Sequence, residues 1–357
     1  MIKNKCELDG EIPLKQDVKI GDKKIGSGHP TYIIAEIGAN HNRNLDIAKE
    51  LIKKAAEAGV DAVKFQTYKA ETLYSKKAPK FSKDPMKPFD LIKSIELPPE
   101  WQHELFIYAT KKKVHFLSSP FDNEAVDLLD NLGVPAFKIA SPEIVDLDLI
   151  RYTAKKKKPM LVSTGMANLG EIEDAVNTIR SVGNNKIVLL HCSTLYPTPV
   201  EVVNLNAIKT LKNAFKLPVG FSDHTMGLHI TIAAVAKGAN VVEKHFSLDR
   251  RMKGPDHHFA IEPSELSQLV RCIRDVEAAM GTGIKERSEL ENQEAYVKAR
   301  RSIHARVDIP KGRKITRAML ITKRPAYGIQ PKFIDLVVGR EAKQEIKKDE
   351  WITWEMI

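Results

Sequence analysis

The 357-residue chain is poor in the features that mark exported or membrane proteins. Its three cysteines, Cys6, Cys192 and Cys272, are far apart and never in a C-x-x-C spacing. That pattern disfavours both a disulfide framework and a structural zinc site, and it suits a reducing cytosol. Residues 1–28 contain no apolar run of signal-peptide or membrane-spanning length. We therefore expect a cytoplasmic protein with no membrane partner.

Acidic residues are also in deficit. The chain has 56 Lys and Arg against 46 Asp and Glu, a formal charge of +10. Such an excess biases the partners toward anions, namely nucleic acid, anionic lipid or phosphorylated small molecules. The excess is concentrated at the end of the chain, because residues 300–357 contain 14 basic and 7 acidic side chains.

What the sequence does contain is a regular alternation of short apolar, β-branched runs with amphipathic stretches. The runs are residues 32–37, 62–66, 114–117, 136–139, 160–163, 187–191, 219–222 and 241–245. Strand followed by helix, repeated eight times over about 250 residues, predicts an α/β protein with a TIM (β/α)₈ barrel. The alternative is an open doubly wound sheet, but the first run leads into Gly38-Ala39-Asn40-His41, which is not the Gly-rich phosphate turn of that fold.

The domain boundaries follow from this count. We expect an N-terminal extension over residues 1–28, the barrel over 29–283, a linker over 284–299 and a small β-rich domain over 300–357. Asn44 is the expected N-cap of a helix over residues 45–58, which Gly59 ends. The stretch 68–99 is too long for an ordinary connection, so it is a lid, an oligomer loop or a solvated insertion.

Every predicted strand ends in polar residues, and the carboxyl ends of the strands are where barrel enzymes place their active sites. A single polar residue there is usually structural, but eight converging polar ends predict a site. These residues are Glu36, Lys64, Gln66, Ser118, Ser119, Lys138, Ser141, Glu143, Ser163, Thr164, His191, Ser193, Thr194, Ser222, Asp223, His224, Glu243 and His245.

Two lysines within apolar strands need an anionic partner if they are buried. Lys64 and Lys138 either pair with Glu36 or Glu143, or they join the nearby hydroxyl groups in a clamp for a small phosphate or carboxylate, and we favour the clamp. Side chains two positions apart on a strand face the same side. Lys64 with Gln66, and Glu243 with His245, are therefore expected to face the barrel axis.

His224 and His245 end the last two predicted strands, which places two imidazoles close together. We expect Asp223 and Glu243 beside them as orienting groups or further ligands. Two histidines with oxygen ligands and open positions suit Mn²⁺, Fe²⁺, Co²⁺ or Mg²⁺ acting as a Lewis acid. A structural histidine pair is the alternative interpretation.

Ten short stretches in this order resemble the sialic acid synthase family of nonulosonic acid synthases. They are residues 34–41 (IAEIGANH), 63–67 (VKFQT), 119–121 (SPF), 137–141 (FKIAS), 163–166 (STGM), 191–199 (HCSTLYPTP), 222–225 (SDHT), 243–246 (EKHF), 254–256 (GPD) and 323–325 (KRP). The resemblance implies a TIM barrel followed by an antifreeze-like (SAF) domain.

It also implies a reaction and its residues. Members of this family condense phosphoenolpyruvate with an open-chain N-acetylhexosamine, N-acetylmannosamine or a 2,4-diacetamido-trideoxyhexose, to give a nine-carbon acid and phosphate. The resemblance assigns phosphoenolpyruvate to Lys64, Ser119, Lys138, Ser141, Ser163 and Ser222, and the acceptor sugar to Glu36, Gln66, Tyr196, Asp256 and Arg324. It assigns a divalent metal, typically Mn²⁺ with Mg²⁺ or Co²⁺ as alternatives, to His224 and His245. We expect catalysis to depend on Glu36, Lys64, Gln66 and Glu243.

Two further expectations concern partners. The family forms a domain-swapped homodimer in which the residue matching Arg324 reaches the site of the other subunit. The acceptor stays open between the sialic, legionaminate and pseudaminate branches, because Thr194 stands where sialic acid synthases often carry Asn. A rival hypothesis from another class is a basic protein that binds an anionic polymer. We expect no nucleic acid partner, since the basic tail has no recognition helix, RNP-type aromatic motif or Arg-rich run.

Overall fold

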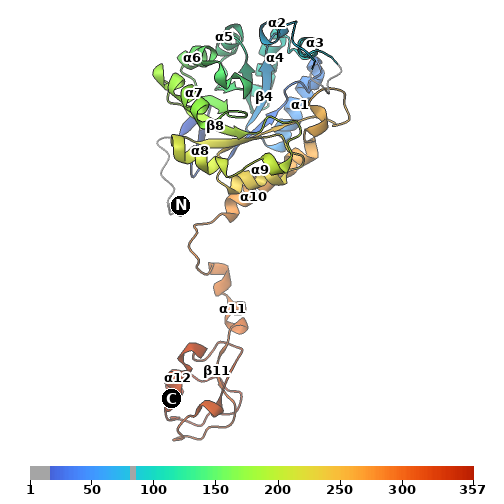
Figure 1. Ribbon diagram of the computed structural model, residues 1–357. Coiled ribbons are helices and arrows are strands. Elements are labelled where there is room, and N and C mark those ends of the chain that lie inside the picture. The colour runs from blue at the N-terminus through green and yellow to red at the C-terminus, as the bar shows by residue number, and fades with distance from the viewer. Residues whose placement is uncertain (1–16, 81–85) are drawn as a thin grey trace. The chain divides into compact units, whose positions relative to one another are not determined.

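The computed structural model describes residues 17–80 and 86–357, and Cys6 lies outside these ranges. The chain forms two compact units, of which the first ends at Gly283 and the second is Ile284–Ile357 (Figure 1). Cys192 and Cys272 are free thiols. Among the described residues, no helix combines the length and apolar character needed to cross a bilayer.

The first unit is built on eight parallel strands that form a ring. The strands are β3 (Tyr32–Glu36), β4 (Ala62–Thr67), β5 (His115–Pro120), β6 (Phe137–Ile139), β7 (Met160–Ser163), β8 (Ile187–Cys192), β9 (Val219–Asp223) and β10 (Val241–His245). They are hydrogen-bonded in the order β5-β4-β3-β10-β9-β8-β7-β6. The two end strands, β5 and β6, lie next to each other and close the ring. The predicted (β/α)₈ barrel is confirmed.

Helices surround this ring, in the upper part of Figure 1. They are α1 (Leu45–Ala58), α4 (Pro99–Lys111), α5 (Asn123–Leu132), α6 (Leu147–Lys155), α7 (Leu169–Ser181), α8 (Ala207–Phe215), α9 (His229–Ala236) and α10 (Pro263–Ala279). The Asn44 side chain accepts hydrogen bonds from the backbone N–H groups of Asp46 and Ile47, and Gly59 ends α1 at φ 86°. Both predicted ends of α1 are confirmed, and the left-handed φ at residue 59 explains the glycine.

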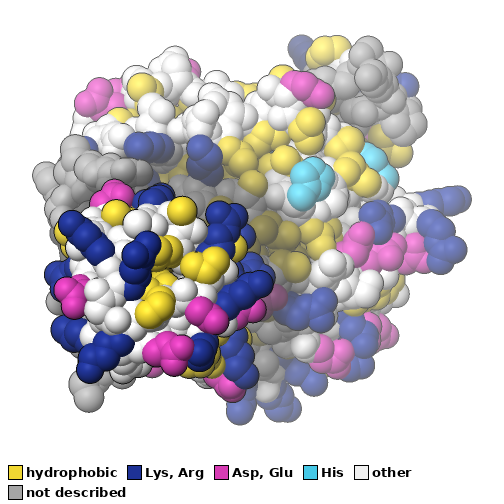
Figure 2. Space-filling model, turned by 90° about the horizontal axis from the view of Figure 1, so that it is seen from below, with side chains coloured by type: hydrophobic (Ala, Val, Ile, Leu, Met, Phe, Trp, Pro, Cys, Tyr) yellow, Lys and Arg dark blue, Asp and Glu magenta, His cyan; other side chains and the backbone are white. Residues whose placement is uncertain are grey.

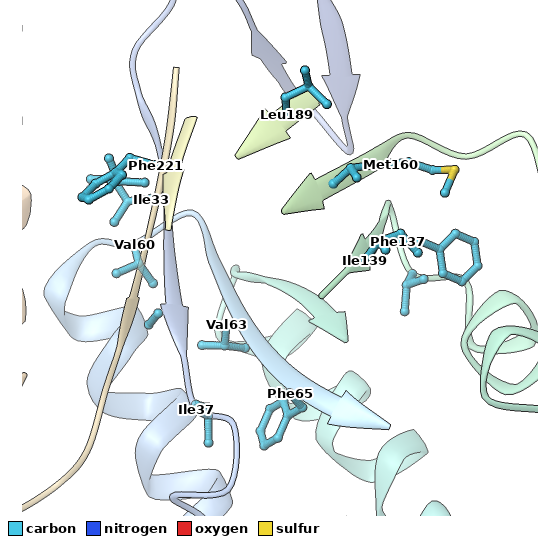
Figure 3. Close-up of a cluster of buried hydrophobic side chains, with 14 of the residues drawn as sticks. Ile33, Ile37, Val60, Val63, Phe65, Phe137, Ile139, Met160, Leu189 and Phe221 are labelled. Atoms are coloured by element: carbon cyan, nitrogen blue, oxygen red, sulfur yellow. The ribbon is translucent and has the colours of Figure 1, made fainter. Parts of the chain in front are cut away.

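The main apolar core lies between the strands and the helices. Alternate strand residues such as Ile33, Val63, Phe65 and Phe221 point outward into it and are almost completely buried (Figure 3). Because side chains alternate along a strand, the residues between them point into the barrel. The lower interior is filled by a second apolar cluster, which contains Ile34, Ala62, Leu117, Leu161, Val188 and Val241.

A β-hairpin that sequence reasoning missed completes this inner cluster. Strands β1 (Val18–Ile20) and β2 (Lys23–Ile25) pair antiparallel, and Val18, Ile20 and Ile25 pack with the inward residues of the barrel strands. Residues 17–28 are thus not a simple extension but a plug for the barrel. The pattern of alternating apolar residues around Gly21-Asp22 is typical of a hairpin and was a usable signal.

Two stretches expected to be irregular contain helices. The insertion 68–99 holds α2 (Ala70–Leu73) and α3 (Pro88–Ile95). The expected linker holds a 3₁₀ turn, Glu289–Asn292, and α11 (Glu294–Ala299), and it belongs to the second compact unit.

The second unit is small and β-rich, with its own core. Strands β11 (Ser302–Ala305) and β12 (Leu320–Lys323) pair antiparallel, and helix α12 (Ile334–Val337) follows. The buried cluster includes Ile303, Ile309, Ile315, Val337, Ile346 and Ile352. On the face shown in Figure 2, Lys and Arg side chains alternate with acidic and apolar ones instead of forming an unbroken basic patch.

The hairpin plug yields the first prediction. Ile20 is fully buried inside the barrel, whereas its neighbour Lys19 is exposed. We expect Ile20→Ala to lower the free energy of unfolding by about 2–5 kcal/mol, because it leaves a cavity in the inner cluster. Urea denaturation measures this change, and Lys19→Ala is the matched control. Equal stability of the two variants would show that the hairpin does not contribute to the core.

Candidate active site

The candidate site lies inside the barrel, at the carboxyl ends of the strands. Glu36 on β3 pairs in register with Lys64 on β4 and with His245 on β10, while Glu243 on β10 pairs with Ser222 on β9. The strand order therefore gathers residues that are more than two hundred positions apart in the sequence, such as Glu36 and His245. All five are buried.

A layer of alternating charges crosses the barrel just above the apolar interior. Lys64 Nζ lies 2.7 Å from Glu36 Oε2, and Lys138 Nζ lies 2.9 Å from Glu243 Oε1. Lys64 Nζ also lies 3.8 Å from Glu243 Oε2, so the two ion pairs are linked. The side chains of all four residues are at most 5% exposed. We call Glu36, Lys64, Lys138 and Glu243 the charge layer.

We favoured a clamp in which the two lysines are not ion-paired, and this expectation was wrong. Both lysines are ion-paired, Lys64 with Glu36 and Lys138 with Glu243 rather than Glu143. The physical reason is burial, because an ammonium group removed from water needs an anion within reach. Glu243 lies 105 positions from Lys138, so the sequence could not identify it as the partner.

The two carboxyl groups of the layer are in opposite electrostatic situations. Burial raises the pKa of Glu36 to about 7, against the pull of Lys64. Burial also acts to raise the pKa of Glu243, but the ammonium groups of Lys138 and Lys64 outweigh it and lower the pKa to about 2. Glu243 is therefore a permanent anion, whereas Glu36 exchanges a proton near neutral pH. When Glu36 is protonated, two cations face one anion and the layer carries a net positive charge.

Serine hydroxyl groups surround this layer. Ser222 Oγ donates to Glu243 Oε1 at 2.9 Å, and Lys64 Nζ lies 3.4 Å from Ser119 Oγ. The Ser163 hydroxyl is buried without a hydrogen-bond partner in the described part of the chain. An unpartnered buried hydroxyl costs free energy unless a ligand or water completes it.

A glycine shapes the loop after β7. The backbone N–H of Gly165 donates to Ser141 Oγ at 3.1 Å. A Cβ at residue 165 would lie 2.3 Å from Thr194 Oγ1 and 2.7 Å from Ser141 Oγ. Only glycine therefore lets this loop approach the two hydroxyl groups closely.

His224 and His245 stand together, with their ring centroids 5.3 Å apart. Burial lowers the pKa of both imidazoles, so they are neutral and retain a lone pair. His224 Nδ1 lies 2.8 Å from the Ser193 carbonyl oxygen and donates to it, which leaves Nε2 free to bind a ligand. His245 Nδ1 is buried and makes no hydrogen bond with any residue that the structure describes, and it lies 3.6 Å from Asp256 Oδ2.

This pair fits a metal with few protein ligands. Both imidazoles are neutral, and one has a nitrogen that makes no hydrogen bond with the described residues. Such a pair suits a metal ion whose other coordination positions are filled by water or substrate oxygen. Within residues 17–80 and 86–357, no group of three or more His, Cys, Asp or Glu side chains is arranged to hold a metal ion. Of the two roles expected for Asp223, that of a further ligand was wrong, because its carboxylate lies on the outer side of the sheet and pairs with Lys244 at 2.7 Å.

Those residues of the first unit that were expected to contact the acceptor gather beside the charge layer. Gln66 Nε2 donates to Glu36 Oε1 at 2.8 Å. A Cβ on Gly38 would lie 3.2 Å from Asp256 Oδ2 and from Glu36 Oε1, so these groups converge over a glycine. The Tyr196 ring lies 4.3 Å from that of His224, centroid to centroid. Arg324 belongs to the second unit, where its side chain is exposed.

Glu143 is a site residue that sequence reasoning noticed but did not retain. It lies in the 3₁₀ turn Pro142–Val145 after β6, where its Oε2 atom is buried without a hydrogen bond among the described residues. Burial raises the pKa of this carboxyl group to about 7. The signal was available in its position, two residues beyond Ser141 at a strand end.

A barrel with cations, hydroxyl groups and a histidine pair at the carboxyl ends of its strands has the architecture of a TIM-barrel enzyme. Sequence comparison narrows this class. Residues 51–285 match the NeuB family and residues 300–357 match the SAF domain, so the chain belongs to the NeuB family. The family resemblance noted from the ten short stretches is confirmed.

Three known proteins show how close the relationship is. The chain is 47% identical over 330 residues to the N,N′-diacetyllegionaminic acid synthase of Campylobacter jejuni, covering 90% of this chain and 98% of that protein. It is 37% identical over 335 residues to the pseudaminic acid synthase of the same bacterium, covering 91% and 94%. The crystal structure of an N-acetylneuraminic acid synthetase from Leptospira borgpetersenii, in complex with citrate, has a TM-score of 0.71 at 34% identity and covers 80% of this chain and 96% of that one.

The charge layer yields the second prediction. Glu243→Gln removes the permanent anion and leaves two buried ammonium groups with one partner, so we expect a loss of about 3–5 kcal/mol in unfolding free energy at pH 7. Since folding lowers the pKa of Glu243, its contribution is present above its ordinary pKa of 4.5 and is lost as the pH falls further. Urea denaturation between pH 7 and pH 3 measures the difference, with the exposed Glu173→Gln as control. A difference from wild type that stays constant down to pH 3 would contradict the assignment.

Proposed function

We propose that this protein condenses phosphoenolpyruvate with the aldehyde of an N-acetylated amino sugar, using one water molecule and releasing inorganic phosphate. The observation that carries this proposal is the charge layer, with serine hydroxyl groups and a neutral histidine pair around it, in a member of the NeuB family. Phosphoenolpyruvate is a polyanion with a weakly nucleophilic C3, so it must be held firmly against the aldehyde.

Lys64 and Lys138 would hold the phosphate and carboxylate groups, together with Ser119, Ser141, Ser163 and Ser222. A charge-balanced layer attracts an anion poorly, but protonation of Glu36 leaves it with a net positive charge. The unpartnered Ser163 hydroxyl supports a ligand in this position. Glu243 would keep the two ammonium groups apart and oriented, since it contacts both.

His224 and His245 would hold a divalent cation, with Mn²⁺ as the first candidate and Mg²⁺ or Co²⁺ as alternatives. When bound, such a cation polarises an aldehyde oxygen and stabilises the negative charge that develops there. Glu36, Gln66, Tyr196 and Asp256 would orient the acceptor sugar. Burial raises the pKa of Asp256 to about 6, so near neutral pH this residue is largely an anion, which can accept hydrogen bonds from sugar hydroxyl groups.

Bond formation between C3 and the aldehyde leaves a cationic C2, to which water adds before phosphate departs. A base must take a proton from that water, and an efficient base has a pKa near the working pH. Glu36 and Glu143 both meet this requirement, whereas Glu243, with its lowered pKa, does not. Glu36 is the candidate expected from the sequence. Because Glu36 must be protonated to give the layer its net positive charge, Glu143 is the candidate that can be ionised at the same time.

For the acceptor, we propose a 2,4-diacetamido-trideoxyhexose of the legionaminate branch. Campylobacter jejuni has a synthase of each branch, and this chain is more similar to the first. It is 47% identical to the diacetyllegionaminic acid synthase and 37% identical to the pseudaminic acid synthase. N-acetylmannosamine is the competing acceptor.

We further propose a homodimer in which the SAF domain of one subunit covers the site of the other. Apolar side chains are exposed in the loops that follow β6, β7, β8 and β9, which is the rim of the site. They are Val145, Met166, Leu169, Leu195, Val200, Val202 and Met226. Exposed apolar side chains gathered at one end of a molecule mark an interaction surface. Arg324 would reach the partner's site, and the free thiols Cys192 and Cys272 suit the cytoplasm as the compartment.

The third prediction tests the reaction. With phosphoenolpyruvate and Mn²⁺, we expect phosphate release only when an acceptor is present, and fastest with 2,4-diacetamido-2,4,6-trideoxymannose. Removal of metal with EDTA should stop turnover, and added Mn²⁺ should restore it. The acceptor panel also contains N-acetylmannosamine and the altrose isomer of the pseudaminate branch, and product masses identify what was formed. Failure with every acceptor would refute the proposed function, and preference for N-acetylmannosamine would refute the branch.

The fourth prediction concerns the base. Since its carboxylate form is the active one, kcat should fall as the pH drops through about 7. Glu36→Gln and Glu143→Gln are compared under identical conditions. The variant that removes the base should lose about 10²–10⁴ in kcat together with this acidic limb of the pH profile. If both variants keep the limb, neither carboxyl group is the base.

A further inference from the structure

Behind the histidine pair, on the outer side of the sheet, lies another buried ion pair, separate from the charge layer. Lys244 Nζ is 2.7 Å from Asp223 Oδ2, and the two side chains are 3% and 0% exposed. The residues are opposite each other in the register of β9 and β10. Asp223 immediately precedes His224 and Lys244 immediately precedes His245, so this pair and the histidines alternate along the same two strands.

The pair holds the backbone that follows His224. Thr225 N–H donates to Asp223 Oδ1 at 2.8 Å, and Lys244 Nζ donates to the Thr225 carbonyl oxygen at 2.8 Å. Thr231 on α9 donates its hydroxyl to Asp223 Oδ2 at 2.5 Å. Residue 225 is thus held through both of its backbone polar groups, one by each member of the ion pair. The backbone of His224 lies between Asp223 and this fixed residue.

Stability alone does not explain an ion pair at this position. A buried ion pair loses its hydration, and apolar residues of similar volume are often as stable or more so. The surroundings are apolar, because Phe221, Val242, Ala234 and Val235 are buried in the layer between strands and helices. Compared with apolar side chains, the charged pair orients the backbone around residue 225, because each charge-assisted hydrogen bond fixes an angle as well as a distance.

We propose that Asp223 and Lys244 are positioning residues that hold His224 and His245 at the spacing at which both imidazoles ligate one divalent cation. This inference rests on the metal site of the proposed function. Outer groups that fix the orientation of metal ligands typically account for 10–100-fold in metal affinity. Neither side chain touches the substrate, so its effect is transmitted through the strand ends.

The test compares two double variants in the full-length protein. Asp223→Asn with Lys244→Met removes the pair without leaving an unpaired charge. Asp61→Asn with Arg274→Met is the matched control, because Arg274 Nη2 and Asp61 Oδ2 form a partly buried ion pair, 3.5 Å apart, between α10 and the residue preceding β4 at the other end of the barrel. Mn²⁺ affinity is measured by electron paramagnetic resonance of free Mn²⁺, and circular dichroism and urea denaturation report folding.

We expect the Kd for Mn²⁺ to rise about 10–100-fold in the Asp223/Lys244 variant and to stay within about twofold in the control. Thr231→Val, which removes only the hydroxyl donor to Asp223, should give a smaller rise and keeps the test available if the double variant does not fold. Unchanged Mn²⁺ affinity in folded Asp223/Lys244 or Thr231 variants would overturn this inference alone. Absence of Mn²⁺ binding in the wild-type protein would overturn the metal site itself, and this inference with it.

Discussion

The linked ion pairs of Glu36, Lys64, Glu243 and Lys138 are the constraint on which the rest of the site depends. Four charges at most 5% exposed are stable only because each lies within reach of an opposite charge. Their burial and spacing also set the protonation states, because the two ammonium groups keep Glu243 ionised, whereas at Glu36 burial outweighs them and raises the pKa. A site that must bind a polyanion and then move a proton near neutral pH needs both conditions.

The barrel supplies the rigid frame that holds such a layer. Below it, the inner apolar cluster and the β1–β2 hairpin exclude water from the barrel interior, which strengthens the interactions within the layer. Above it, the strand ends and the segments that follow them hold Ser163, the histidine pair and Glu143, each with a buried atom or lone pair that the described chain leaves unused. Unused hydrogen-bonding capacity in an otherwise well-paired interior marks the volume in which the substrates would bind.

Much of the fold and part of the site followed from the sequence. The period of two along strands placed Lys64, Gln66, Glu243 and His245 inside the barrel, and the eight apolar runs defined the ring. The same period predicts that the Asp223 side chain points out of the barrel, because its neighbours Ser222 and His224 face the site. That error came from treating neighbours in sequence as neighbours in space.

Other features needed the three-dimensional structure. The Lys138–Glu243 pair joins β6 to β10 across the barrel, and no local pattern links residues 105 positions apart. The raised pKa of Glu143 depends on how deeply a 3₁₀ turn is buried, which composition does not report. The hairpin is visible in the alternation of residues 18–25, but each of its strands has only three residues and is much shorter than the apolar runs that mark the barrel.

Reaction in H₂¹⁸O with phosphoenolpyruvate and the diacetamido acceptor tests the central claim most directly. If water adds to C2 and the C–O bond then breaks, the phosphate keeps the bridging oxygen of phosphoenolpyruvate. Mass spectrometry should then find no ¹⁸O in the released phosphate, and release should require the acceptor. Phosphate that carries ¹⁸O, or that appears without acceptor, would show attack at phosphorus and contradict a condensing synthase.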